Sequence, residues 1–187
     1  MKTHILKRVF IIVSLFSILG CNLLSNMQDE FPYDLMIGPD DLSDEFVYNS
    51  SGFEEIEDAK SFYIAYEKNT YELGSLISHQ ITIYSDIETA KKSIPFWESK
   101  LFTNDWFFSK ENQFMPSDPE DYYTFRCLNS QINGQDFQSC TMFQQHENLI
   151  IVITVNIDNK IFTVSKFDEI QNRLDTRLPI ETIPIPK

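Results

Sequence analysis

The stretch FRCLNSQINGQDFQSCTM, residues 125–142, places an Asn-Gly pair midway between two cysteines. Asn133-Gly134 is a favoured centre for a two-residue type I′ hairpin turn, because both central positions of that turn need a positive φ. Such a turn sets Cys127 directly opposite Cys140. Opposite residues that do not exchange hydrogen bonds have Cα atoms roughly 4.5 Å apart, within the usual disulfide range. The stretch therefore predicts a β-hairpin closed by a Cys127–Cys140 disulfide.

The same register extends along the chain in both directions. Glu147-Asn148 would make the next turn, and Asp158-Asn159 a third. One side of the resulting four-stranded antiparallel meander is then almost wholly apolar, as a core face should be. That side carries Phe125, Cys127, Cys140, Met142, Ile153, Val155, Phe162 and Val164.

The other side of the meander is mixed in character. Its large apolar residues need cover, and they are Phe143, Ile150, Val152 and Ile161. We expect the N-terminal segment to lie over them. The alternative is a docking face for a ligand or partner protein. Trp106 and Phe107 begin a second candidate site, the long loop 103–121, where they either cap the open end of the core, which we expect, or contact a ligand.

Two helices are predicted from apolar residues spaced three and four apart. The first covers residues 86–102, with a capping box formed by Ser85 and Glu88, and with Pro95 as a kink inside it. The second begins after Ser165 and ends before Pro179. Both apolar stripes are expected on the apolar side of the sheet.

Alternating apolar residues at 62–66 and 77–83 predict a β-hairpin before the first helix. The predicted fold class is therefore α+β. Its antiparallel sheet consists of the hairpin and the four-stranded meander, with both helices packed on one face. One domain should span residues 35–178, followed by a proline-rich extended tail over 179–187.

The chain begins with a basic stretch, residues 1–8, and an apolar run over 9–19 that is too short to span a bilayer. It continues Ile18-Leu19-Gly20-Cys21. This order of parts resembles the lipobox signal of bacterial lipoproteins. The resemblance implies a signal peptide over 1–20, a diacylglyceryl group such as one containing palmitate on Cys21, and a lipidated tether over 21–34.

Cleavage before Cys21 would remove three basic residues and no acids, so the net charge would fall from −13 to −16. So acidic a surface argues against binding nucleic acid. The expected location is extracytoplasmic, in the cell envelope, with the lipid anchor as the contact to the membrane. An exported domain meets an oxidising environment, which agrees with the predicted disulfide.

The sequence contains no nucleophile elbow, metalloprotease helix, P-loop or dinucleotide-binding glycine motif. We therefore expect no catalytic residues, cofactor or metal site. Of the two histidines in the mature chain, His79 should lie on an apolar strand face and His146 should be exposed beside a turn.

These observations favour a non-catalytic binding or interaction module whose partner is an envelope protein or a small ligand. One alternative is an envelope structural protein. The other is a hydrolase that uses scattered carboxylates, although nothing in the spacing of the acids selects a catalytic pair.

Overall fold

The computed structural model describes residues 31–56, 58–68, 76–132, 135–157 and 162–185. The chain divides into two compact units, Met1–Tyr33 with Pro186–Lys187, and Asp34–Ile185. In the described part of the first unit, the rings of Phe31 and Tyr33 lie 5.4 Å apart. The fold described below is that of the second unit.

Its elements follow one another as η1 (Tyr33–Leu35), η2 (Pro39–Asp41), β1 (Phe46–Ile56), β2 (Ala59–Lys68), β3 (Leu76–Tyr84), α2 (Ile87–Leu101), β4 (Phe107–Phe108), β5 (Tyr122–Ile132), β6 (Gln135–His146), β7 (Leu149–Ile157) and α3 (Val164–Asp175).

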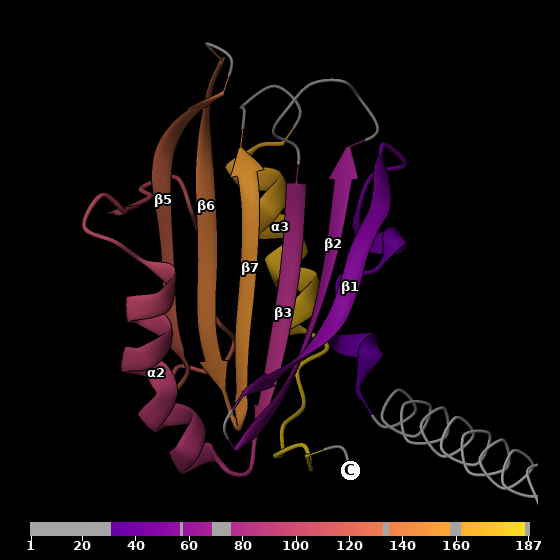
Figure 1. Cartoon of the computed structure of the whole chain (residues 1–187), viewed down its shortest axis with the longest axis vertical. Helices are drawn as coiled ribbons and strands as arrows, with labels where there is room; N and C mark the ends of the chain where they lie inside the picture. The colour runs from indigo at the N-terminus through magenta and orange to yellow at the C-terminus, as the bar shows by residue number, and fades with distance from the viewer. Residues whose placement is uncertain (1–30, 57, 69–75, 133–134, 158–161, 186–187) are drawn as a thin grey trace, which may run out of the picture. The chain divides into compact units, whose positions relative to one another are not determined.

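Seven strands among the described residues form one sheet in the order β1-β2-β3-β7-β6-β5-β4 (Figure 1). Every neighbouring pair is antiparallel. The predicted first hairpin is present as β2 and β3. The predicted antiparallel sheet is confirmed, in a fold of few helices that is α+β or mostly β. A third strand, β1, extends the hairpin, and β7 joins it to the meander by pairing with β3.

The register of the meander agrees with the prediction. Cys127 pairs with Cys140, and both Cys140–Val155 and Met142–Ile153 are pairs of β6 and β7. Glu147 has the positive φ, 47°, that the tight turn after β6 requires. The turn residues Asn133 and Gly134 lie outside the described residues.

The predicted fourth strand of the meander is wrong, because Thr163 begins a helix instead. Its side chain accepts a hydrogen bond from the backbone of Lys166, and Val164 is the first residue of α3. Phe162 contacts Phe167 of that helix, with ring centroids 6.4 Å apart. The helix also ends earlier than expected, at Asp175. The proposed turn at 158–159 is outside the described residues.

The first predicted helix is α2, a single helix with Pro95 inside it. Its N-cap is Asp86 rather than Ser85. The Asp86 carboxylate accepts a hydrogen bond of 2.8 Å from the backbone of Thr89, which satisfies one of the free amides at the helix start.

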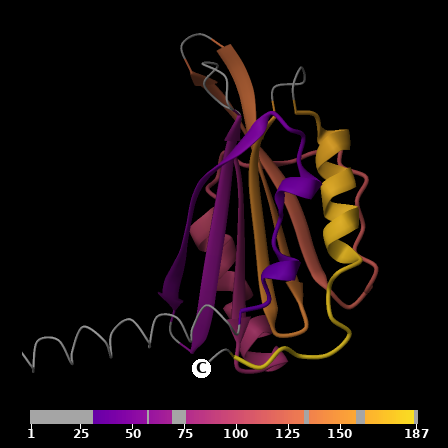
Figure 2. The same ribbon diagram turned by 90° about the vertical axis from the view of Figure 1, so that its right-hand side faces the viewer.

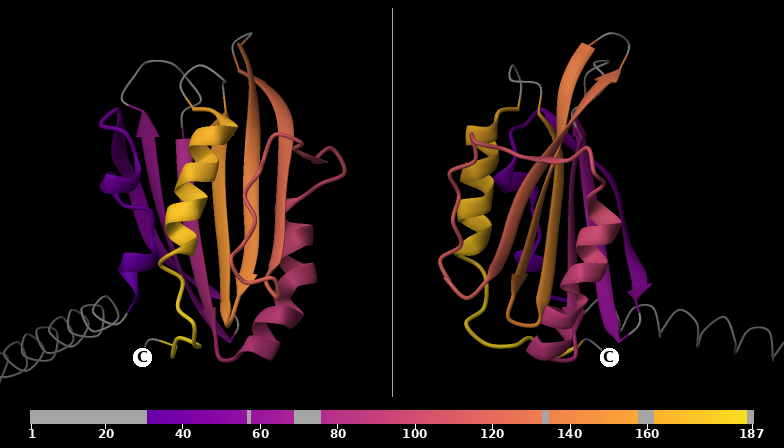
Figure 3. Two further views of the ribbon diagram at one scale, coloured as in Figure 1. Left: turned by 180° about the vertical axis from the view of Figure 1, so that it is seen from behind. Right: turned by 90° about the vertical axis from the view of Figure 1, so that its left-hand side faces the viewer.

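The two helices lie on opposite faces of the sheet, which corrects the expectation that both pack on one face (Figure 3). Because side chains alternate between the faces, both faces have apolar positions to cover. Phe125 of β5 contacts Phe167 of α3, and Trp97 of α2 is in the cluster that contains Phe143 and Ile150. The mixed face is covered by α2 and not, as expected, by the N-terminal segment, whose described residues 34–41 lie on the α3 side (Figure 2).

The long segment between β4 and β5 passes around the β5 edge of the sheet and reaches α3 (Figure 3). Asn112 donates to Asp168 at 2.7 Å, and the backbone of Ser117 donates to Asp175 at 3.0 Å. This loop is therefore fastened to the helix on the far face. None of the helices among the described residues combines the length and apolar character needed to cross a bilayer.

Candidate functional site

The predicted docking face is closed where the structure describes it. Phe143 and Ile150 are 0% exposed and Val152 is 5% exposed, because α2 lies over them with Trp97 and Phe102. The fourth residue of that face, Ile161, lies outside the described residues. These apolar side chains therefore belong to the core between the sheet and α2.

Trp106 and Phe107, the predicted loop aromatics, have different surroundings. Trp106 is half-buried and its ring centroid lies 5.4 Å from that of Phe102. Phe107 and Phe108 form the short strand β4 and are 38% and 68% exposed. The exposed aromatic side chains at this edge are thus those of the β4 pair, which point to opposite faces of the sheet because they are adjacent in a strand.

Arg126 of β5 lies beside that pair. Its guanidinium is 4.6 Å from the ring centroid of Phe102 and 4.9 Å from that of Phe108. It also forms an ion pair of 2.7 Å with Glu98 of α2, to which Tyr122 donates a hydrogen bond of 2.6 Å. Burial raises the pKa of Tyr122, and the hydrogen bond to Glu98 and the charge of Glu98 raise it further, to about 12. This network fixes α2 to the sheet and neutralises the arginine.

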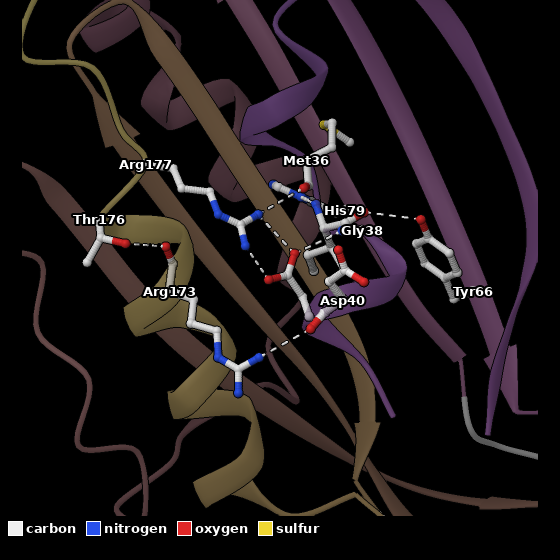
Figure 4. Close-up of polar contacts among 10 residues, drawn as sticks. Met36, Gly38, Asp40, Tyr66, His79, Arg173, Thr176 and Arg177 are labelled. Atoms are coloured by element: carbon white, nitrogen blue, oxygen red, sulfur yellow. Dashed lines mark hydrogen bonds and ion pairs between the residues drawn. The ribbon is translucent and has the colours of Figure 1, made fainter. Parts of the chain in front are cut away.

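A second polar cluster joins the end of α3 to the segment 36–41 (Figure 4). Arg177 donates to both carboxylate oxygens of Asp41, to one of them at 2.9 Å. The backbone of Gly38 donates to the same carboxylate at 2.9 Å. Burial raises the pKa of Asp41, but the hydrogen bonds from Arg177 and Gly38 outweigh it and leave the pKa below its usual value.

His79 of β3 lies beneath this cluster (Figure 4) and is 1% exposed, on the predicted apolar face. Its Nδ1 accepts a hydrogen bond of 3.0 Å from the backbone of Ile37. Its Nε2 is buried and has no hydrogen-bond partner in the part of the chain that the structure describes. Burial lowers the pKa of His79 to about 3. The charge of Arg177 also lowers this pKa, and the charge of Asp41 raises it by less than the burial lowers it. This histidine is neutral at pH 7 and supports the core.

His146 is buried, at 7% exposed, which corrects the expectation that it lies in solvent. It ends β6 opposite Leu149, so its side chain shares the α3 face with Met142 and Gln144. Its Nδ1 lies 2.9 and 3.0 Å from the two carboxylate oxygens of Asp121. Its Nε2 lies 2.6 Å from the carbonyl oxygen of Pro179.

With an acceptor at each ring nitrogen, His146 donates from both. Burial lowers its pKa, but the hydrogen bonds to Asp121 and Pro179 and the charge of Asp121 outweigh that effect and raise the pKa to about 9. His146 and Asp121 form an ion pair. The hydrogen bond from His146 to Pro179 holds the segment after α3 against the sheet.

An open depression of about 290 Å³ lies beside His146. Its lining includes Asp118, His146, Asp175 and Pro179. Asp118 and Asp121 come from the loop before β5, and His146 from the end of β6. The sequence shows the acids of this loop as a local group, but only the fold brings them to the histidine. The alternation of side chains along β6 is the signal that would have predicted His146 on the α3 face.

Comparison of the chain with protein-family models, curated proteins and solved structures finds no match.

Proposed function

We propose that this chain is a lipoprotein of the bacterial cell envelope, and that its domain is a non-catalytic binding or interaction module. The observation that carries the proposal is that two of the three cysteines form a disulfide with each other. Cys127 and Cys140 are joined to each other in adjacent strands, so Cys21, at the end of the leader, is the cysteine left for lipidation.

The anchor is tested by intact-mass analysis of the full chain, expressed with its own leader in a bacterial host and extracted from membranes. We expect loss of residues 1–20, acyl groups on Cys21, and two hydrogens fewer than the reduced chain. The Cys21→Ser variant should keep its leader and carry no acyl group. The matched control, Cys127→Ala with Cys140→Ala, should lose its leader and be acylated like the parent. A Cys21→Ser variant that matures and stays with membranes would overturn this part of the proposal.

The exposed aromatic pair of β4 supports the binding role of the domain. Phe107 and Phe108 project from a two-residue strand at the edge of the sheet, and large exposed apolar side chains at an edge favour contact with a partner. In-cell crosslinking should capture an envelope protein or a second copy of the chain through this edge.

The test uses a double variant that carries both Phe107→Ser and Phe108→Ser. The single variant Phe96→Ser is the control. Phe96 is a 54% exposed aromatic residue of α2, so it matches the pair in chemistry but not in position. A crosslinked species lost only in the β4 variant supports the module. Capture of the chain by itself favours the envelope structural protein instead, and crosslinking unaffected by the β4 variant contradicts the assigned surface.

A further inference from the structure

Three side chains around the depression can offer ligand atoms to one cation. One donor atom each from Asp118, Asp121 and His146 lies within 4.8 Å of the others. Zinc binds nitrogen and oxygen ligands at about 2.0–2.2 Å, so two ligand atoms of a tetrahedral site are about 3.3–3.6 Å apart. Side-chain rotations that shorten the present separations by up to about 1.5 Å would bring all three onto one ion.

Two of the three side chains are already held in place by buried contacts. The side chains of His146 and Asp121 are 9% and 5% exposed. The Nε2–H of His146 donates to the carbonyl of Pro179 at 2.6 Å, which directs Nδ1 toward Asp121. Gln144, itself 2% exposed, donates to the Asp121 carboxylate at 2.8 Å. Metal-binding histidines usually donate their second ring nitrogen to a carbonyl or carboxylate in this way.

Asp175 also lines this depression, and its carboxylate oxygen Oδ1 is buried and has no hydrogen-bond partner among the described residues. Its other oxygen accepts from the backbone of Ser117. A buried carboxylate oxygen without a donor is unfavourable, and positive charge at this depression would offset part of that cost.

We propose that Asp118, Asp121 and His146 bind a first-row divalent metal ion of the zinc type. One nitrogen and two carboxylate ligands suit such an ion, whereas magnesium and calcium prefer oxygen ligands throughout. Three protein ligands leave a fourth position of a tetrahedral site, which faces the depression and is open to water or a small anionic ligand. The metal would take the place of the hydrogen bond between Nδ1 of His146 and Asp121.

The proposal is independent of lipidation and is tested on the full chain in detergent. After treatment with EDTA and dialysis, ZnCl₂ is titrated in by calorimetry, and we expect saturable binding of one equivalent. Asp118→Asn should weaken zinc binding at least tenfold. Its thermal midpoint in EDTA should stay within about 1 °C of the parent, because Asp118 lies outside the buried pair and an asparagine oxygen can still accept from the backbone of Glu120.

Glu120→Gln is the matched control, since it removes the same charge from an exposed residue two positions away. It should leave the zinc affinity unchanged. The cobalt-loaded protein should show visible absorption that His146→Gln abolishes. Absence of saturable zinc binding, equal affinities of the Asp118→Asn and Glu120→Gln variants, or calcium binding as tight as that of zinc would each overturn the proposal.

Discussion

His79 and His146 are both buried on the α3 face of the sheet, but their partners differ. The backbone of Ile37 donates to His79, which requires an unprotonated Nδ1, whereas His146 meets an acceptor at each ring nitrogen. Burial alone lowers the pKa of a histidine. Only in His146 do a carboxylate and a carbonyl outweigh it, so burial fraction does not predict the charge of either residue.

His79 predicts a loss of stability in mild acid. Its pKa is about 3 in the folded chain and about 6.5 in an unfolded one. Between these values the unfolded state binds the extra proton. The contribution of His79 is therefore fully present above pH 6.5 and is lost as pH falls, by up to about 1.4 kcal/mol per pH unit. Urea denaturation at pH 6.5, 5.5 and 4.5 measures it.

The matched variant for this measurement is His79→Asn. Its side-chain oxygen can accept from Ile37, but the residue does not titrate. Asp41, whose pKa is below its usual value, also loses stabilising charge in acid, but only below the chosen pH range. The variant should show a flatter dependence than the parent between pH 6.5 and 4.5. Parallel curves would contradict the neutral state of buried His79.

At the scale of elements, the disulfide constrains the hairpin of β5 and β6. Cys127 and Cys140 are 13 residues apart and both are 0% exposed. Closing a loop of this length stabilises a fold by about 3 kcal/mol, chiefly through the unfolded chain. Cys127→Ala with Cys140→Ala should lower the free energy of unfolding by that amount, and reductant should then have no further effect.

The residue that packs α2 against the sheet, Trp97, provides a second prediction of lost stability at the scale of elements. Trp97 is fully buried, and its indole nitrogen donates to the hydroxyl of Tyr84 at 2.9 Å. Trp97→Phe removes that donor and leaves a cavity, at a cost of about 2–3 kcal/mol in urea denaturation. Phe96→Ala, in the next position but 54% exposed, should cost less than about 1 kcal/mol. Equal losses would contradict the packing of α2.

Local signals in the sequence predicted the elements better than their placement. Asn133-Gly134 and the two cysteines specify a register by geometry within a few residues, and the structure has that register. The apolar stripes predicted both helices. A stripe, however, shows only that one side of a helix is buried, and not which face of the sheet receives it. With both sheet faces apolar in part, that choice depends on the whole fold.

β1 was missed because its sequence weakens the alternation that marks a strand. It contains Asn49, Ser50, Ser51 and Gly52 in succession, and its register shifts between Tyr48 and Ser50. The expected fourth strand failed for a related reason. Phe162 and Val164 alternate like a strand, but the Thr163 cap gives the same residues a helical start.

At the scale of the whole molecule, the sheet is closed by pairs between distant segments. β3 pairs with β7 although α2, β4, β5 and β6 lie between them in the chain. Neither turn chemistry nor periodicity specifies such a pair. The same limit applies to the site around His146, whose partners come from the loop before β5 and from the segment after α3. Each member is visible in the sequence, but their meeting is a property of the fold.

The segment after α3 provides the last prediction, because it is bound to the sheet at successive points. The carbonyl of Pro179 accepts from His146, and Ile183 exchanges two hydrogen bonds, of 2.7 and 2.9 Å, with the side chain of Asn148, which is 0% exposed. Ending the chain after Leu178 removes the hydrogen bonds that Pro179 and Ile183 make with His146 and Asn148, and should cost about 2–4 kcal/mol. Ending it after Ile185 keeps every one of these contacts and should cost almost nothing in the same urea denaturation. Equal stability of the two truncated chains would show that the segment only lies on the surface and does not hold β6 and β7 in place.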